Sequence, residues 1–330
     1  MIITVDAYGG DNCPKAAVEG ALSALLIDSE LKIKLVGNKA ELEQLVNAEG
    51  GSDRIEIINS EEIITCEDSP AEVIREKPNS SMVVALSTLK GDSSAVVSAG
   101  STGALLAGGI MKVGRIRGIH RPALCTVLPT ANGGDVVFLD CGANSECTEK
   151  TLVGFAAAGK IYSKTVLGNE QPKIGLLNNG TEKTKGMQIH RDAYEILSND
   201  EPLFVGNVEG RDILSGKVDV VVADGFSGNV AIKTMEGTAS TIFKILKSNI
   251  KSGGFKAKIG ALLLKSALKN TAKALDYTER GGAVLLGLKG IVVKTHGASD
   301  KKAFAATILQ ARDIAKGDFC AKCAQALGEE

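Results

Sequence analysis

Within its first third the chain reads Ala95-Val96-Val97-Ser98-Ala99-Gly100-Ser101-Thr102-Gly103, a short β-branched strand that turns through glycine into a helical pattern. Strands alternating with longer helices are typical of βαβ units and of a largely parallel sheet, so we predict an α/β fold. The alternation recurs along the chain. Strands are predicted at 2–5, 32–36, 54–58, 95–98, 136–139, 173–177, 203–205, 218–223 and 291–294, and helices at 14–26, 102–113, 148–164, 187–197, 228–247 and 301–315.

The size and composition of the chain narrow the classes of function. Its 330 residues suffice for one large α/β unit, and no repeat or long linker divides them, so we expect one continuous unit over 1–330. Aromatic residues make up 4% and Trp is absent, which argues against stacking on single-stranded nucleic acid. The net charge of −1 gives the whole molecule no reason to bind a polyanion, so no nucleic-acid partner is predicted.

The cysteine pattern predicts a cytoplasmic protein, and the N-terminus shows no targeting signal. Met1-Ile2-Ile3-Thr4-Val5-Asp6 has no basic region and is expected to be a first strand, not a signal peptide. No run of about 18 uncharged apolar residues occurs, so no membrane-spanning segment is predicted. The seven Cys are spaced irregularly, which favours reduced thiols over a disulfide framework.

Small and polar residues follow seven of the predicted strands. These loops begin at Asp6, Ala99, Asp140, Asn178, Gly206, Asp224 and Thr295. In open α/β sheets the carboxyl ends of the strands line the ligand crevice. One such loop would indicate only a turn, but seven are more than helix starts require, so we expect the active site at this edge.

The turn Gly100-Ser101-Thr102-Gly103 has two interpretations. Its glycines and the following helix N-terminus suit an anion such as phosphate, whereas a plain Ser/Thr N-cap explains the same residues equally well. The turn is neither a P-loop nor a complete Gly-x-Gly-x-x-Gly, so nucleotide binding is not predicted.

Ionisable residues in the loops are the candidates for substrate binding and proton transfer. Taken singly, each carboxylate is better explained as an N-cap or turn residue, and each cation as a solvated surface charge. His296 follows a strand end, although a structural hydrogen bond explains it as well. We predict no metal, cofactor or covalent intermediate. The predicted phosphate- and substrate-binding residues are Asp6, Gly9, Gly10, Asp11, Lys15, Gly100, Ser101, Thr102, Gly103, Asp140, Asn144, Glu209 and Arg211.

The segment 237–275 carries eight Lys and no Asp or Glu. On a helix the apolar residues at 255, 259, 262 and 263 share one side, with lysines beside them. We therefore predict a basic amphipathic helical projection over 237–280 that binds an anionic membrane or an acidic partner, with packing in a dimer interface as the alternative. The predicted contact residues are Lys256, Lys258, Ile259, Leu262, Leu263, Lys265 and Lys269.

Together these loops resemble one family, the bacterial phosphate acyltransferases of phospholipid synthesis, which act on acyl-acyl carrier protein. The resemblance runs from Val5-Asp6-Ala7-Tyr8-Gly9-Gly10-Asp11 to Gly281-Gly282-Ala283-Val284-Leu285-Leu286-Gly287-Leu288-Lys289-Gly290 and His296-Gly297. It includes 98–105, 139–147, 184–186, 206–213 and 224–237, which is nearly the whole chain in order.

The chain departs from the family pattern at a few loop positions. The family opening usually reads Asp-Ala-Met-Gly-Gly-Asp-His, whereas this chain has Tyr8 and Asn12, so no base is available at the last position. Ser101 stands where Asn is common and keeps a hydrogen-bonding side chain. Asn179 replaces an apolar residue and Lys183 an acidic one, which puts ligand binding by that loop in doubt.

The resemblance implies a Rossmann-like α/β/α sandwich related to the isocitrate and isopropylmalate dehydrogenases and to phosphotransacetylase, with projecting helices. It implies transfer of a fatty acyl group from acyl carrier protein to inorganic phosphate, giving acyl phosphate for phosphatidic acid synthesis. It also implies a homodimer with peripheral membrane association, and a downstream glycerol-3-phosphate acyltransferase that uses the product. Because acyl carrier protein is acidic, the basic projection would also suit its docking.

The expected mechanism places phosphate against the backbone N–H groups at 100–103, aided by Lys185 or Arg211. Asn229 would stabilise the oxyanion, and Asp224 or His296 would supply the proton for the departing thiol. Two other functions are weighed against this one. An NAD-dependent dehydrogenase is disfavoured by the absent glycine-rich fingerprint, and a non-catalytic membrane adaptor has little use for a polar crevice. The predicted catalytic residues are Lys185, Asn229, Asp224 and His296.

Overall fold

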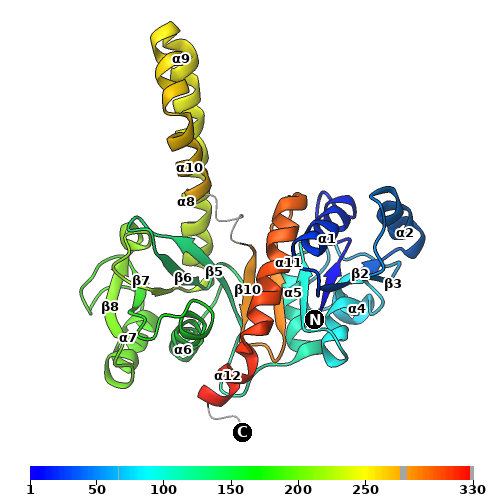
Figure 1. Ribbon diagram of the computed structural model, residues 1–330. Helices are drawn as coiled ribbons and strands as arrows, with labels where there is room; N and C mark the ends of the chain where they lie inside the picture. Colours follow the sequence, from blue (N-terminus) through cyan, green and yellow to red (C-terminus); the bar gives the residue numbers. More distant parts are fainter. Residues whose placement is uncertain (66, 276–280, 328–330) are drawn as a thin grey trace.

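One sheet of eleven strands organises the protein in the computed structural model, which describes residues 1–65, 67–275 and 281–327 (Figure 1). The strands are β1 (Ile2–Asp6), β2 (Lys32–Gly37), β3 (Ile55–Asn59), β4 (Ala95–Ser98), β5 (Ala123–Pro129), β6 (Asp135–Leu139), β7 (Ile174–Asn178), β8 (Phe204–Glu209), β9 (Val220–Val222), β10 (Ala283–Leu286) and β11 (Ile291–Lys294). Their order across the sheet is β3-β2-β1-β4-β11-β10-β5-β6-β9-β7-β8.

Helices cover both faces of the sheet, so the architecture is the predicted α/β/α sandwich. Successive strand residues point to opposite faces, and thus Val97 and Val96 belong to different cores. The first core is covered by α1 (Lys15–Ile27), α2 (Lys39–Ala48), α6 (Glu149–Thr165), α7 (Gln188–Asp200), α11 (Lys301–Lys316) and α12 (Phe319–Ala326). The second is covered by α3 (Val73–Glu76), α4 (Ser81–Ser87), α5 (Thr102–Gly108) and α8 (Gly225–Ser252).

The sheet consists of two parallel halves that run in opposite directions. The antiparallel strands β10 and β5 join the half that ends in β11 to the half that begins with β6. Val97 of β4 is level with Val293 of β11, which pairs with Val284 of β10. Val284 pairs with Cys125 of β5, and Cys125 with Leu139 of β6. This register brings the carboxyl ends of both halves to one level in the middle of the sheet.

The predicted strands and helices are present, with their ends shifted by a few residues. The sequence does not predict β5 or β10, because these central strands lack the strand–helix alternation on which the prediction rests. The prediction that a loop begins at Gly206 is wrong, since β8 continues to Glu209. Gly206 has a φ of 103°, which lets the backbone bend and then pair again with β7.

The long helix α8 carries the projection. Its 28 residues span about 42 Å, and its distal half rises out of the body with α9 (Gly254–Leu263) packed on its end (Figure 1). From there α10 (Lys265–Leu275) leads back toward the body, and 276–280 of the expected projection lie outside the described residues. Over the ranges described, no helix is long and apolar enough to cross a membrane.

The close contact between α1 and α11 predicts a stability difference between two helical glycines. A Cβ on Gly20 would overlap the Cβ of Phe304 and lie 3.0 Å from the Lys301 carbonyl oxygen. Gly20→Ala should therefore lower the free energy of unfolding by about 1–3 kcal/mol. Gly154→Ala in α6, where a Cβ meets nothing within 4 Å, should raise it by about 0.4–1 kcal/mol. Urea unfolding measures both, and equal effects would contradict this packing.

Candidate active site

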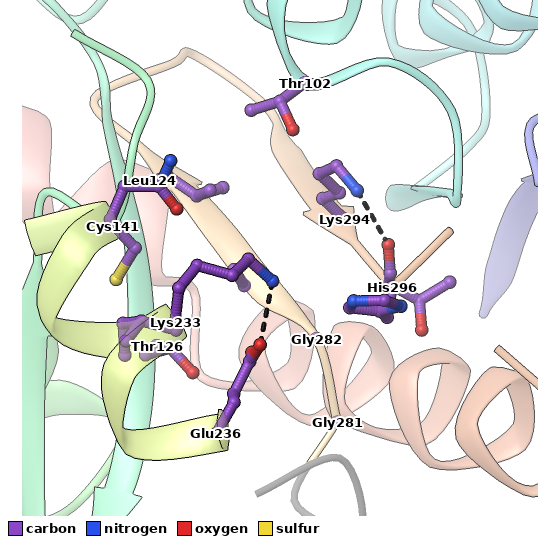
Figure 2. Close-up of a pocket in the computed structure, with 14 residues that line it drawn as sticks. Thr102, Leu124, Thr126, Cys141, Lys233, Glu236, Gly281, Gly282, Lys294 and His296 are labelled. Atoms are coloured by element: carbon purple, nitrogen blue, oxygen red, sulfur yellow. Dashed lines mark hydrogen bonds and ion pairs between the residues drawn. The ribbon is translucent and has the colours of Figure 1, made fainter. Parts of the chain in front are cut away.

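A cavity of about 150 Å³, the central cavity, opens where the two halves of the sheet meet (Figure 2). The start of α5, the end of β11, one side of α8 and the strands β5 and β10 contribute to its lining. Its polar side chains come from Thr102, Thr126, Asn229, Lys233, Glu236, Lys294, Thr295 and His296. Leu124, Cys141, Ile232 and Ala283 supply its apolar part. The cavity therefore offers both hydrogen-bonding and hydrocarbon surface.

The glycine-rich turn reaches this cavity through Thr102. The Gly100 N–H donates to Ser98 Oγ (3.0 Å), and Ser98 Oγ donates to the buried carboxylate of Asp6 (2.6 Å). Ser101 is the N-cap of α5, with its Oγ accepting from the Ala104 N–H (3.5 Å). The N-cap interpretation thus describes Ser101, and the Gly100 N–H already has a partner.

Asp6 and the two glycines after it hold neighbouring loops together. Burial raises the pKa of Asp6, whose carboxylate also accepts from the Tyr8 N–H. A Cβ on Gly9 would lie 2.7 Å from the Gly100 nitrogen, and one on Gly10 would lie 2.8 Å from the Gly297 carbonyl oxygen. These residues support the turn and the loop after β11, which Asp11 also joins through its N–H to the Gly297 oxygen (2.8 Å).

His296 follows β11 and lines the central cavity. Its Nδ1 accepts a hydrogen bond from the Ala298 N–H (3.2 Å). In the neutral imidazole the proton is then on Nε2, which can donate to a ligand or to a leaving group. The local hydrogen bond orients the ring, so the structural and functional interpretations of His296 are compatible.

A buried carboxylate organises the other side of the cavity. Asp140 accepts from the N–H groups of Leu124 (3.0 Å), Gly142 (3.2 Å), Ala143 (3.0 Å) and Asn144 (2.8 Å), and from Asn144 Nδ2 (2.8 Å). Burial raises its pKa, but all its acceptor positions are used in fixing the loop. Asp140 and Asn144 are therefore positioning residues.

Asn229 is held against the loop that Asp140 fixes. Its side chain would lie 3.1–3.4 Å from a Cβ on Gly142, and it lines the central cavity from the start of α8. Gly228 packs on the Asp140 carbonyl oxygen, where no larger residue fits. The Asn229 amide is a hydrogen-bond donor and shares the lining of the cavity with Cys141, and burial raises the pKa of the Cys141 thiol well above its usual value.

A second cavity of about 570 Å³ lies beyond the first turn of α8. Its lining includes Asn178, Asn179, Gly186, His190 and Ser227. Behind it Nε2 of His190 lies 3.4 Å from Oδ2 of Asp224, and both side chains are buried. Asp224 Oδ1 also accepts from the Ser227 N–H (2.9 Å) as the N-cap of α8. Burial opposes ionisation of Asp224, but His190 and the Ser227 amide lower its pKa to about 2.

The structure divides the predicted site residues between these places. Thr102, Asn229 and His296 line the central cavity together. Lys185 lies in the loop between β7 and α7, next to Gly186, and its carbonyl oxygen accepts from Asn178; both Asn178 and Gly186 line the second cavity. Arg211 pairs with Glu209 and follows Gly210, which also lines the second cavity. The two cations are thus grouped with the second cavity and not with the glycine-rich turn.

Lys15 and Gly103 have structural surroundings of their own. Lys15 is exposed on α1 and pairs with Glu19 at 3.7 Å, as a solvated surface charge would. A Cβ on Gly103 would lie 2.8 Å from Pro70 Cγ, which explains a glycine at this point of α5.

The sequence did not single out several cavity residues. Lys233 and Glu236 form an ion pair at 2.8 Å across one turn of α8, and Lys294 Nζ donates to the Thr295 carbonyl oxygen at 3.0 Å. The sequence carries no signal for His190, because this residue follows no strand and its contact with Asp224 spans 34 positions of the chain. Among the residues described, no His, Cys, Asp and Glu side chains are grouped so as to hold a metal ion.

The comparisons with known proteins agree with this architecture. A phosphotransacetylase from Streptococcus pyogenes superposes with a TM-score of 0.64 at 19% identity, covering 95% of this chain and 94% of that one. A branched-chain phosphotransacylase from Enterococcus faecalis gives 0.56 at 16% identity, covering 96% and 99%. At these identities the likeness concerns the fold alone, and it agrees with the expected phosphotransacetylase-like fold.

Sequence comparison defines the family. Residues 1–322 match the family described as fatty acid synthesis protein, and the chain belongs to it. Within that class it is 48% identical to the phosphate acyltransferase of Streptococcus uberis, over 99% of this chain and 98% of that protein. The phosphate acyltransferase of Streptococcus pneumoniae is also 48% identical, with 99% of each chain covered. The chain is therefore a member of the phosphate acyltransferase family, as the sequence resemblance implies.

The contact between Asp224 and His190 predicts a pH dependence of stability. The folded-state pKa of Asp224 is lowered from 3.8 to about 2, so its contribution is present above about pH 4 and is lost as the pH falls through 2. The shift corresponds to about 2 kcal/mol. Asp224→Asn should lose correspondingly less stability than the wild type between about pH 5 and pH 2 in urea unfolding. Asp53→Asn, at an exposed carboxylate, is the control, and parallel curves for Asp224→Asn and the wild type would contradict the prediction.

Proposed function

We propose that this protein transfers a fatty acyl group from the thioester of acyl carrier protein to inorganic phosphate, giving acyl phosphate. One structural observation supports the proposal in addition to family membership. The central cavity combines the donors Thr102, Asn229 and His296 with the apolar side chains of Leu124 and Ile232. An acyl thioester and a phosphate need both kinds of surface within reach of each other.

Phosphate binds at the start of α5 in this proposal. The helix N-terminus favours an anion, and the Thr102 hydroxyl adds a donor. A phosphate oxygen attacks the thioester carbonyl carbon, and its negative charge passes to the carbonyl oxygen. Asn229 donates to that oxyanion from the opposite side of the cavity. Positioning carries most of the catalysis, because phosphate is already an anionic nucleophile near neutral pH.

Collapse of the tetrahedral intermediate re-forms the carbonyl group and breaks the bond between carbon and sulfur. The electron pair leaves with the sulfur, which takes up the proton that hydrogen phosphate loses, and His296 Nε2 donates a hydrogen bond to the departing sulfur. His296 suits this role better than Asp224, which is buried and engaged with Ser227 and His190. Lys185 and Arg211 would attract anionic groups of the substrates from the side of the second cavity.

The test mixes the purified protein with palmitoyl-acyl carrier protein and phosphate, follows the free carrier thiol and traps acyl phosphate with hydroxylamine. Phosphate-dependent thiol release matched by acyl hydroxamate supports the transferase. Thiol release without hydroxamate would mean thioester hydrolysis. If no thiol is released with carrier proteins of several acyl chain lengths, the proposal is overturned.

Loss of the proposed oxyanion donor should slow turnover. Asn229→Ala should lower kcat by about 10²–10³, because a donor that acts on the developing charge is removed. Asn47→Ala, which changes an exposed asparagine of α2, is the matched control and should retain the wild-type rate. Lys185→Ala in the same assay tests the predicted cation. Full turnover by either Asn229→Ala or Lys185→Ala removes that residue from the mechanism.

We also propose that the projection binds an anionic membrane surface and acyl carrier protein. In this proposal the protein is a cytoplasmic homodimer, and each chain is one continuous α/β unit over 1–330. The support is the character of the projection: Phe255, Leu262 and Leu263 are 78%, 70% and 80% exposed, and Lys256, Lys258, Ile259, Lys265 and Lys269 are exposed near them. Exposed apolar side chains among cations suit a lipid interface. Consumption of the acyl phosphate by a glycerol-3-phosphate acyltransferase stays a prediction from the family.

Vesicle binding tests the membrane contact. Replacing Leu262 and Leu263 together by Asp should weaken binding to phosphatidylglycerol vesicles by at least about tenfold, because burial of each Leu contributes on the order of 1.5–3 kcal/mol. Leu26→Asp, which changes an 88% exposed leucine of α1, should bind like the wild type. Co-sedimentation measures all three proteins, and equal binding by the double variant would exclude this surface.

A further inference from the structure

A small apolar cavity of about 60 Å³ lies between α8 and the end of β5. It shares two lining residues, Ile232 and Glu236, with the central cavity. The rest of its lining includes Leu128, Leu214, Met235 and Ala239. Nothing in the mechanism above uses this space.

The two cavities follow one seam between the same two elements. Leu124 and Thr126 line the central cavity and Leu128 lines the apolar one, so a single face of β5 runs beneath both. The α8 residues that line the central cavity are at positions 229, 232, 233 and 236, and those that line the apolar cavity are at 232, 235, 236 and 239. These are neighbouring positions on one side of a helix, and the distance from 229 to 239 along the axis is about 15 Å.

The chemistry of the lining changes along this seam. It begins at the donor Asn229 and ends among the hydrocarbon side chains of Leu128, Met235 and Ala239. The charges of Lys233 and Glu236 pair with each other at 2.8 Å where the two cavities meet (Figure 2). A polar ligand would find few partners at the far end, whereas a long apolar group would bury its surface there.

On the basis of the acyl transfer proposed above, we propose that the seam between α8 and β5 holds the acyl chain of the thioester. The carbonyl group lies at Asn229, the chain passes Ile232, and Met235 and Ala239 contact its distal carbons. Beyond Ala239 the next residue on this side of the helix is Ile242, which is 57% exposed. Longer chains therefore extend from the seam along α8 toward the projection.

Chain-length preference tests the proposal. A phenylalanine at position 239 fills the far end of the seam, which a palmitoyl chain reaches and a hexanoyl chain does not. Ala239→Phe should lower the ratio of kcat/KM for palmitoyl- over hexanoyl-acyl carrier protein by at least about tenfold. Thr234→Phe, at an exposed position of α8 that lines neither cavity, adds the same ring outside the seam and should keep the wild-type ratio. An unchanged ratio in folded Ala239→Phe would overturn the assignment.

A second variant decides the case if Ala239→Phe does not fold. Met235→Ala widens the same end of the seam and should raise the ratio in favour of palmitoyl, and an unchanged ratio would again overturn the proposal. The wild-type protein separates the two questions. If it shows no phosphate-dependent turnover with either chain, the proposed function fails, whereas turnover with a ratio that neither variant changes refutes only the seam.

Discussion

The buried carboxylate of Asp140 is the constraint on which the arrangement of this protein depends. A buried anion is unfavourable unless donors surround it, and here five N–H donors supply that environment. One of them belongs to Leu124 of β5, so the same group connects β5 to the loop after β6. The loop after β6 consequently has one favoured conformation, and its shape defines one wall of the central cavity.

That loop in turn determines where α8 begins. The Asn144 carbonyl oxygen accepts from the Gly225 N–H at 2.9 Å, and Gly228 contacts the Asp140 carbonyl oxygen. Asp224 caps the helix and is held by His190, so its first turn is bound on two sides. Because α8 is continuous for 28 residues, this fixed start also orients the seam and the projection. A single helix thus joins the reacting groups to the exposed apolar surface.

The local patterns of the sequence predicted more of the fold than of the site. Strand and helix patterns identified nine strands, because those strands alternate with helices along the chain. The two central strands β5 and β10 were not predicted, and neither was the reversal of direction between the two halves of the sheet. Strand pairing depends on register, which the local sequence pattern does not determine. Of the predicted site residues, Thr102, Asn229 and His296 line one cavity. The contacts that occupy Asp140 and Asp224 connect residues whose proximity only the folded chain creates.

The reversal has a chemical consequence for the site. In a sheet of one direction, every helix that follows a strand begins at the same edge. Here α5 follows β4 of one half and α8 follows β9 of the other, and both begin beside the central cavity because the register brings their strands to one level. Thr102 at the start of α5 and Asn229 in the second turn of α8 therefore line the cavity from different halves of the sheet. In the proposed mechanism phosphate and the developing oxyanion are two separate negative charges, and Thr102 of α5 and Asn229 of α8 would each donate to one of them.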